Sequence, residues 1–215
     1  MPRAFLLFPL VCVSLAGCAA GTIKGKVNDE TVPPMGQGAW ISIDVAGSTY
    51  VELITTDVPK VCETFTAVAQ AESDAFQQLL TDFDTDRAQL AFEAAEQDNL
   101  PEEYWETVFG FTTDDLASAE GDYTIGDASV AFSVTHVTGY TDWHDYFTTG
   151  TLTTQSDTST AASGSATVNS LEEGKSMDAD GDADMVDESG SDAGSISWKM
   201  SGDYCQGYSD LLGSI

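Results

Sequence analysis

The stretch AWISIDVAGSTYVELIT, residues 39–55, decides the fold class of this chain. Apolar residues occupy every second position from Ala39 to Val45, and polar residues such as Asp44 lie between them. A second short apolar run follows the glycine-containing turn at residues 46–48. Two short runs with a period of two, joined by such a turn, predict a β-hairpin.

A helical hairpin is expected at residues 59–98, directly after these strands. Asp57 can cap a helix, and Pro59 suits the first helical turn. A second helix should begin near Asp84 and end at Leu100-Pro101. The apolar residues of the first helix recur at helical spacing: Val61, Phe65, Val68, Phe76 and Leu79.

Alternation with a period of two then returns, which predicts further strands. The strongest stripes are Trp105, Thr107, Phe109 and Phe111, then Val130, Phe132, Val134 and His136, and finally Ile196, Trp198 and Met200. Shorter candidates lie at residues 146–154 and 166–171. The expected fold is a single α+β domain at residues 39–215, an antiparallel β-sheet or sandwich with an inserted helical hairpin. Two segments without a period are expected to be loops, a flexible one at residues 155–165 and an acidic one at residues 172–194.

The N-terminus has the pattern of an export signal. A positive start at Arg3 precedes an apolar run at residues 4–15, which is too short to span a bilayer permanently. The run ends in Leu15-Ala16-Gly17-Cys18, which resembles the lipobox of bacterial lipoproteins. An ordinary secretory signal with a chance cysteine is the alternative, and either signal exports the protein.

The lipobox resemblance has four implications. Residues 1–17 are a signal peptide that is removed, and Cys18 takes a diacylglycerol and becomes the acylated N-terminus. Residues 18–38, rich in Gly and Pro, would be a flexible tether. Ala19 resembles the residue found in lipoproteins that are passed on to the outer membrane. The expected location is therefore the cell envelope, with the membrane as a partner through the lipid.

The charge of the chain excludes one class of partner. The formal net charge is −29, with 36 acidic residues against seven Lys and Arg. Nucleic acid is not an expected partner, because binding it requires a cationic face. Anionic lipids would repel the domain as well, so attachment to a membrane must come from acyl chains. A protein or glycan partner is left unidentified by the sequence.

Two cysteines remain for the folded domain once Cys12 leaves with the signal peptide and Cys18 carries the lipid. In an oxidising compartment, Cys62 and Cys205 are most simply a disulfide. Two independent buried thiols are the alternative.

An aspartate-rich segment suggests calcium, the one cofactor that the sequence indicates. Alternating aspartates around a glycine resemble the calcium loops of EF-hands, dockerins and thrombospondin type 3 repeats. The glycine falls at the fourth place and not the sixth, and Ser189 stands where an EF-hand has its bidentate glutamate, so the segment is not an EF-hand. A solvated acidic loop is the alternative. The candidate ligands are Asp178, Asp180, Asp182 and Asp184.

Signals of catalysis are weak. No set of ligands with zinc spacing and no Gly-x-Ser-x-Gly segment occurs. The least implausible cluster for a general base is Asp142, His144 and Asp145. The sequence therefore favours a non-catalytic structural or binding role in the cell envelope. A calcium-dependent adhesion or ligand-binding module and a diverged hydrolase remain the alternatives.

Overall fold

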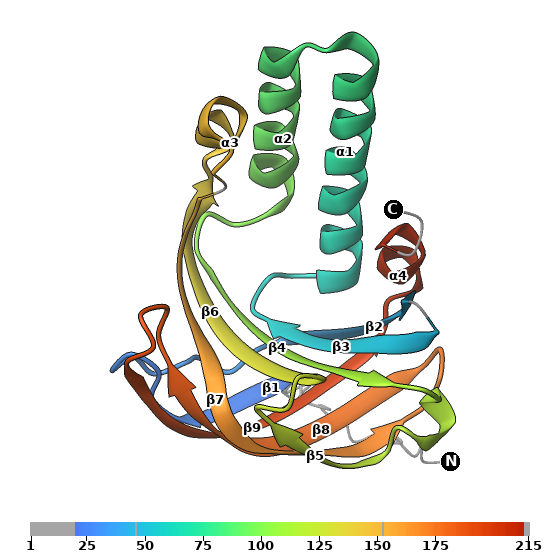
Figure 1. Ribbon diagram of the computed structural model, residues 1–215, viewed down its shortest axis with the longest axis vertical. Helices are drawn as coiled ribbons and strands as arrows, with labels where there is room; N and C mark the ends of the chain where they lie inside the picture. Colours follow the sequence, from blue (N-terminus) through green and yellow to red (C-terminus); the bar gives the residue numbers. More distant parts are fainter. Residues whose placement is uncertain (1–19, 46, 152, 213–215) are drawn as a thin grey trace, which may run out of the picture.

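The computed structural model describes residues 20–45, 47–151 and 153–212. These residues form nine strands in one strongly curved, mostly antiparallel sheet, and a helical hairpin stands on its outer face (Figure 1). The α+β class and the inserted hairpin are as the sequence predicts. The lipobox and Cys18 lie outside the described residues.

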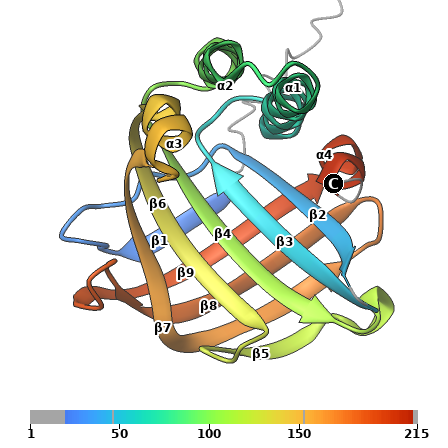
Figure 2. The ribbon, with the colours of Figure 1, turned by 45° about the horizontal axis from the view of Figure 1, so that its top comes forward.

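Seven of the strands pair in a closed order, which we call the strand ring (Figure 2). Neighbours in the ring are antiparallel, except that β9 and β2 close it through two parallel pairs, Ala39 with Asp203 and Trp40 with Tyr204. In order around the ring the strands are β2 (Gln37–Val45), β3 (Ser48–Thr56), β4 (Tyr104–Thr113), β6 (Val130–Thr141), β7 (Thr154–Leu171), β8 (Ser176–Val186) and β9 (Asp192–Tyr204). Outside the ring, β1 (Gly21–Gly25) adds to β9 and β5 (Gly121–Ile125) adds to β7.

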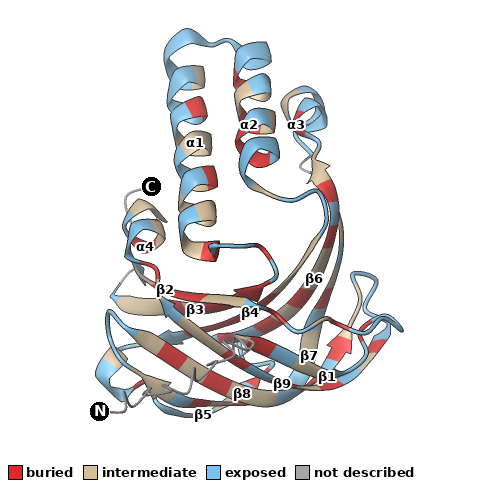
Figure 3. Ribbon diagram, turned by 180° about the vertical axis from the view of Figure 1, so that it is seen from behind, coloured by how far each residue is buried: buried red, intermediate tan, exposed pale blue. Residues whose placement is uncertain are grey.

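The interior of the strand ring is the main hydrophobic core. Alternate residues of each strand point inward, which gives the banded burial pattern in Figure 3. Burying one large apolar side chain contributes about 1.5–3 kcal/mol, so this core is the chief source of stability. The three predicted stripes of β4, β6 and β9 all face it. Its largest members include Trp40, Phe109, Phe111, Phe132 and Met200, all almost fully buried.

A smaller apolar layer joins the helices to the outer face of the sheet. Ala39 and Ile41 of β2 point away from the ring and pack with Val61, Phe65 and Cys205. The predicted apolar stripe of the first hairpin therefore faces the helices, while Trp40 between them faces the ring interior. The helices are α1 (Val61–Asp82), α2 (Thr85–Asn99), α3 (Trp143–Thr149) and α4 (Gln206–Leu212), and η1 (Leu116–Ser118) is a short 3-10 turn.

The helical hairpin ends close to the predicted residues, but one cap differs. Asp84 caps α2 by accepting a hydrogen bond from the backbone N–H of Arg87. Asp57 does not cap α1, because Lys60 occupies that position in a left-handed conformation. The carboxylate of Asp57 instead accepts the backbone N–H of Trp105 at 2.9 Å.

The predicted tether at residues 18–38 is wrong for the part that the structure describes. Gly21–Gly25 form β1 and pair with β9, and Val27, Val32 and Met35 are buried in the main core. Backbone hydrogen bonds also join Gly21 to Met35 in both directions. Three widely spaced apolar residues gave no periodic signal, yet each is buried in the main core.

The predicted loops are also wrong. Residues 155–165 belong to β7, and the acidic segment 172–194 contains β8 and the start of β9. In β8, small or flexible residues such as Met177, Ala179 and Ala183 face the core while the aspartates face outward. The segment thus has a period of two in which alanine and methionine, and not branched residues, mark the inner face. The strand expected at residues 146–154 is wrong, because residues 146–149 belong to α3 and the next strand, β7, begins only at Thr154.

The predicted disulfide between Cys62 and Cys205 is confirmed. It links the first turn of α1 to the residue between β9 and α4. Disulfides persist in oxidising compartments, which favours a location outside the cytoplasm. Among the described residues, no helix is both long enough and apolar enough to span a membrane.

Candidate functional site

A pocket of about 450 Å³ opens at one end of the strand ring. This volume is within the usual range for small-molecule sites, about 300–1,000 Å³. The pocket lies where the segment after β1, the first residues of β4, the strands β6 and β7, and the β8–β9 turn come together. Its lining is formed by Val27, Asn28, Glu30, Trp105, Val134, His136, Asp157, Thr158, Asp187, Glu188 and Ser189.

Two aromatic rings form the wall of the pocket. Trp105 of β4 lies directly opposite His136 of β6 in the sheet register. The two rings are stacked, with centroids 4.2 Å apart and planes 9° from parallel. Strand pairing brings the two rings together, because directly opposite side chains on antiparallel strands lie about 5 Å apart.

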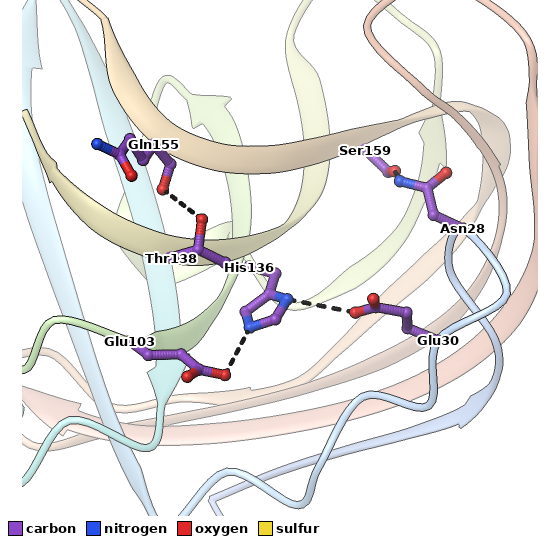
Figure 4. A network of polar contacts seen from close by, with 7 residues as sticks. All are labelled: Asn28, Glu30, Glu103, His136, Thr138, Gln155 and Ser159. Atoms are coloured by element: carbon purple, nitrogen blue, oxygen red, sulfur yellow. Dashed lines mark hydrogen bonds and ion pairs between the residues drawn. The ribbon is translucent and has the colours of Figure 1, made fainter.

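His136 is held between two carboxylates from distant parts of the chain (Figure 4). Its Nδ1 lies 3.2 Å from Oε2 of Glu30, and its Nε2 lies 3.2 Å from Oε1 of Glu103. Carboxylates accept hydrogen bonds and imidazole nitrogens donate only when protonated. Both contacts are therefore hydrogen bonds at once when the ring carries two protons or one carboxyl is protonated. The side chain of His136 is only 16% exposed, whereas those of Glu30 and Glu103 reach solvent.

A tight turn presents Glu30 to the histidine. Asn28 and Asp29 both have left-handed backbone conformations, with φ of 52° and 66°. The backbone N–H groups of Val27 and Glu30 each donate to the other's carbonyl oxygen, at 3.0 and 2.9 Å. This is the geometry of a two-residue hairpin turn, which Asn and Asp tolerate well. The side chain of Asn28 also donates to the buried Ser159 hydroxyl at 3.0 Å, which fixes the turn across the pocket (Figure 4).

The lining of the pocket is acidic. Glu30, Asp157, Asp187 and Glu188 contribute four carboxyl groups, and no Lys or Arg is among the described lining residues. Asp187 also shapes the β8–β9 turn, accepting hydrogen bonds from the hydroxyl of Ser189 and from two backbone N–H groups. These hydrogen bonds, that of the Ser189 hydroxyl first, lower the pKa of Asp187, so its carboxylate stays charged.

The predicted calcium ligands lie elsewhere, on the outer face of β8. A strand advances about 3.3 Å per residue, so four alternate side chains are spread over roughly 20 Å. Calcium requires its oxygens about 2.3–2.6 Å from one ion, which this spacing does not allow for all four. In the described part of the chain, no group of three or more His, Cys, Asp or Glu side chains is arranged to hold a metal ion. The prediction of a calcium loop is therefore wrong in its geometry.

Three of these aspartates instead accept hydrogen bonds from side chains of the neighbouring strands. Asp178 accepts from the hydroxyl of Ser170 at 3.0 Å, and Asp180 accepts from the side-chain amide of Asn169 at 2.7 Å. Asp184 accepts from two serine hydroxyls, at 2.7 and 3.1 Å, which lowers its pKa. Their side chains thus add hydrogen bonds across the outer face of the sheet.

The cluster of Asp142, His144 and Asp145 does not form a catalytic arrangement. Asp142 caps α3 by accepting the backbone N–H of Asp145 at 2.9 Å. The ring of His144 contacts Gln89 of α2 at 3.3 Å, and within the described residues it contacts neither aspartate. Sequence reasoning missed Glu30 and Glu103, whereas His136 was predicted only as the end of an apolar stripe.

Comparisons with known proteins identify no relative of this chain. No family model matches the chain, and searches of curated proteins and of solved structures find no match.

Proposed function

We propose that this chain is a lipid-anchored binding protein of the cell envelope that captures a small, positively charged ligand in the pocket at the end of the strand ring. The observation that carries the ligand class is the lining, which combines four carboxyl groups with an aromatic wall and contains no described Lys or Arg. The role is non-catalytic.

Ammonium and guanidinium groups fit this lining best. The four carboxyl groups of the lining offer acceptors to such a group. The face of a tryptophan attracts a cation by about 0.5–2 kcal/mol, depending on how far the cation is desolvated. The net charge of −29 also raises the concentration of cations around the whole molecule. The small organic cation is therefore preferred over an anion or a neutral apolar ligand.

The anchor is proposed from the lipobox at Leu15-Ala16-Gly17-Cys18. Ala20 is already part of the fold, because its carbonyl oxygen accepts the backbone N–H of Ser201 at 2.6 Å. A chain of three residues spans at most about 10 Å, so the lipid on Cys18 would hold the domain close to the bilayer. The pocket lies at the far end of β1 from Ala20 and would open away from the membrane.

Calorimetric titration of the mature domain tests the ligand class. Choline, spermidine and arginine are the probes, in about 0.5 M sodium chloride so that general attraction is screened. We expect at least one probe to bind about tenfold more weakly to Glu30→Gln/Glu188→Gln. The matched control is Asp180→Asn/Asp182→Asn, which removes the same charge from the outer face of β8. Equal affinities in the two double variants would contradict a cation site in the pocket.

Membrane fractionation with mass spectrometry of the N-terminus tests the anchor. Cys18→Ala should yield an unprocessed or soluble protein, whereas Cys12→Ala should leave the mature lipoprotein unchanged. Cys18→Ala protein that is cleaved at the same site and remains wholly in the membrane fraction would refute lipidation.

A further inference from the structure

His136 is the one described lining residue of the pocket whose side chain can carry a positive charge. Its two ring nitrogens each lie 3.2 Å from a glutamate oxygen, of Glu30 on one side and of Glu103 on the other (Figure 4). The ring is also stacked on Trp105. The imidazole therefore already has the surroundings that suit a cation, which are carboxyl groups beside it and an aromatic face against it.

A third carboxyl group faces the histidine from the neighbouring strand. His136 of β6 lies directly opposite Asp157 of β7 in the sheet register, and side chains in such positions lie about 5 Å apart on the same face. Two of the four lining carboxyl groups, Glu30 and Asp157, are thus neighbours of the imidazole. The other titratable groups of the described lining, Asp187 and Glu188 of the β8–β9 turn, are acidic as well.

The contacts of His136 suit a ring that carries two protons. A neutral imidazole has a proton on one nitrogen only, so its other nitrogen presents a lone pair to a carboxylate oxygen. Two acceptor atoms at such a distance repel each other, whereas a second proton makes both contacts attractive. If a carboxyl group holds this proton instead, the total charge is the same. Glu30, His136 and Glu103 together thus form a site for one additional proton, which we call the proton site.

A ligand cation in the pocket would compete with this proton. Glu30 belongs both to the pocket lining and to the proton site, and Asp157 lies next to His136. A cation held by these carboxylates would therefore lie near a protonated imidazole, and like charges at close range disfavour each other. The side chain of His136 is mostly buried, so solvent ions screen this repulsion less than they would at the surface.

We infer that His136 is a built-in competitor of the ligand, so that binding of the cation expels one proton from the proton site and acidic pH releases the cation, a role that rests on the proposed function and adds its regulation. The proton passes to solvent as the cation enters. The pocket therefore keeps its total charge when the ligand carries a single positive charge.

The direction of the pH response follows from linkage. The empty pocket binds the proton more tightly than the occupied pocket does, so affinity for the cation rises with pH and becomes constant once His136 is neutral. Imidazole side chains change charge between about pH 5 and 8, which sets the window. Protonation of the lining carboxylates at lower pH would weaken binding in the same direction. The experiment must therefore separate the histidine from the acids.

Calorimetric titration at about pH 5.5 and about pH 7.5, at constant ionic strength, tests the coupling. The probe is whichever of choline, spermidine and arginine binds the mature domain. We expect its dissociation constant to be at least about fivefold larger at the lower pH in the wild type, and to change less than about twofold in His136→Gln. The matched control is His144→Gln, which removes the only other histidine of the chain, on α3, and should respond as the wild type does.

Nitrogen NMR of the two imidazole rings identifies the titrating group without a change at His136. His144→Gln assigns the signals, because one histidine then remains. At about pH 6, saturation of the wild type with the probe should shift the His136 ring toward its neutral form and leave the His144 ring unchanged.

The two measurements separate failure of the coupling from failure of the cation pocket. Equal affinities of the wild type at both pH values overturn the coupling and leave the proposed function intact. The same holds for an equal pH response in His136→Gln, or for a His136 ring whose protonation does not change on saturation. If none of the three probes binds the wild type at about pH 7.5, the proposed function fails and the coupling fails with it.

Discussion

Cys62, in the first turn of α1, is bonded to Cys205 at the end of β9, with their Cα atoms 5.4 Å apart. The bond closes a loop between residues that are 143 positions apart in the sequence. Both cysteines lie in the small apolar layer under the helices, where the bond ties the start of α1 to the end of β9. Both the stability of the domain and the position of the hairpin therefore depend on it.

The first prediction concerns this bond. Cys62→Ser/Cys205→Ser should lower the free energy of unfolding by about 2–5 kcal/mol, because the unfolded chain regains the entropy that the closed loop removes. Urea unfolding followed by tryptophan fluorescence measures the loss. The wild type in reductant is the control and should match the variant. Unfolding curves that coincide for the variant and the oxidised wild type would contradict this prediction.

The second prediction concerns the pH dependence of global stability. Burial raises the pKa of Glu106 to about 7, so the folded state binds more protons than the unfolded state between about pH 4.5 and 7. Unfolding free energy should therefore fall as the pH rises through this window. Glu106→Gln should make the fall smaller and raise the melting temperature at about pH 8. Asp180→Asn is the exposed control. Identical pH profiles for Glu106→Gln and the wild type would be inconsistent with a proton held at Glu106.

The third prediction concerns a close approach inside the ring. Gly181 of β8 lies against Trp198 of β9, and a Cβ atom there would collide with the carbonyl oxygen of Ser165 and with the indole ring. Gly181→Ala should thus destabilise the domain by about 1–3 kcal/mol through overpacking. Gly36→Ala, where a Cβ would meet nothing within 4 Å, is the matched control. Thermal unfolding of both variants tests this prediction. Equal melting temperatures for Gly181→Ala and Gly36→Ala would contradict it.

The strands with branched or aromatic inner faces could be predicted from the sequence. The stripes at Phe109 and Phe132 have a period of two that core packing alone explains. The inner face of β8 could not be predicted from the sequence, because its alanines and methionines are weak strand signals between strongly charged neighbours. The acidic residues of this segment were interpreted as a sign of a loop. In the folded ring, however, the outer face of the sheet is in contact with solvent, so a strand can carry charged residues at every second position.

The candidate site could be predicted only in part. His136 was expected on the inner face of its strand, next to Val134, and it lies there. Its partners Glu30 and Glu103 come from a turn and from the linker before β4, and the pairing depends on how the ring closes. No local sequence pattern predicts that His136, Glu30 and Glu103 lie close together in the fold.

The last prediction concerns the aspartates of β8 and separates screening from coordination. Asp178, Asp180, Asp182 and Asp184 face outward along one strand, and Asp178, Asp180 and Asp184 accept hydrogen bonds from neighbouring strands. Cations should relieve their mutual repulsion, and screening depends on ionic strength and not on the identity of the ion. We therefore expect calcium, magnesium and sodium to give equal melting temperatures at matched ionic strength.

A real calcium site would behave differently in the same experiment. Calcium at ten times its dissociation constant would add about 1.4 kcal/mol of stability, and magnesium would add less because it keeps its waters. Asp180→Asn/Asp182→Asn would abolish such a gain, whereas under screening alone it should raise the melting temperature at low salt by removing repulsion. A calcium-specific rise that this variant abolishes would mean that β8 rearranges into a loop to bind the ion. Without that rise, the aspartates serve as the solvated, hydrogen-bonded outer face of the strand ring.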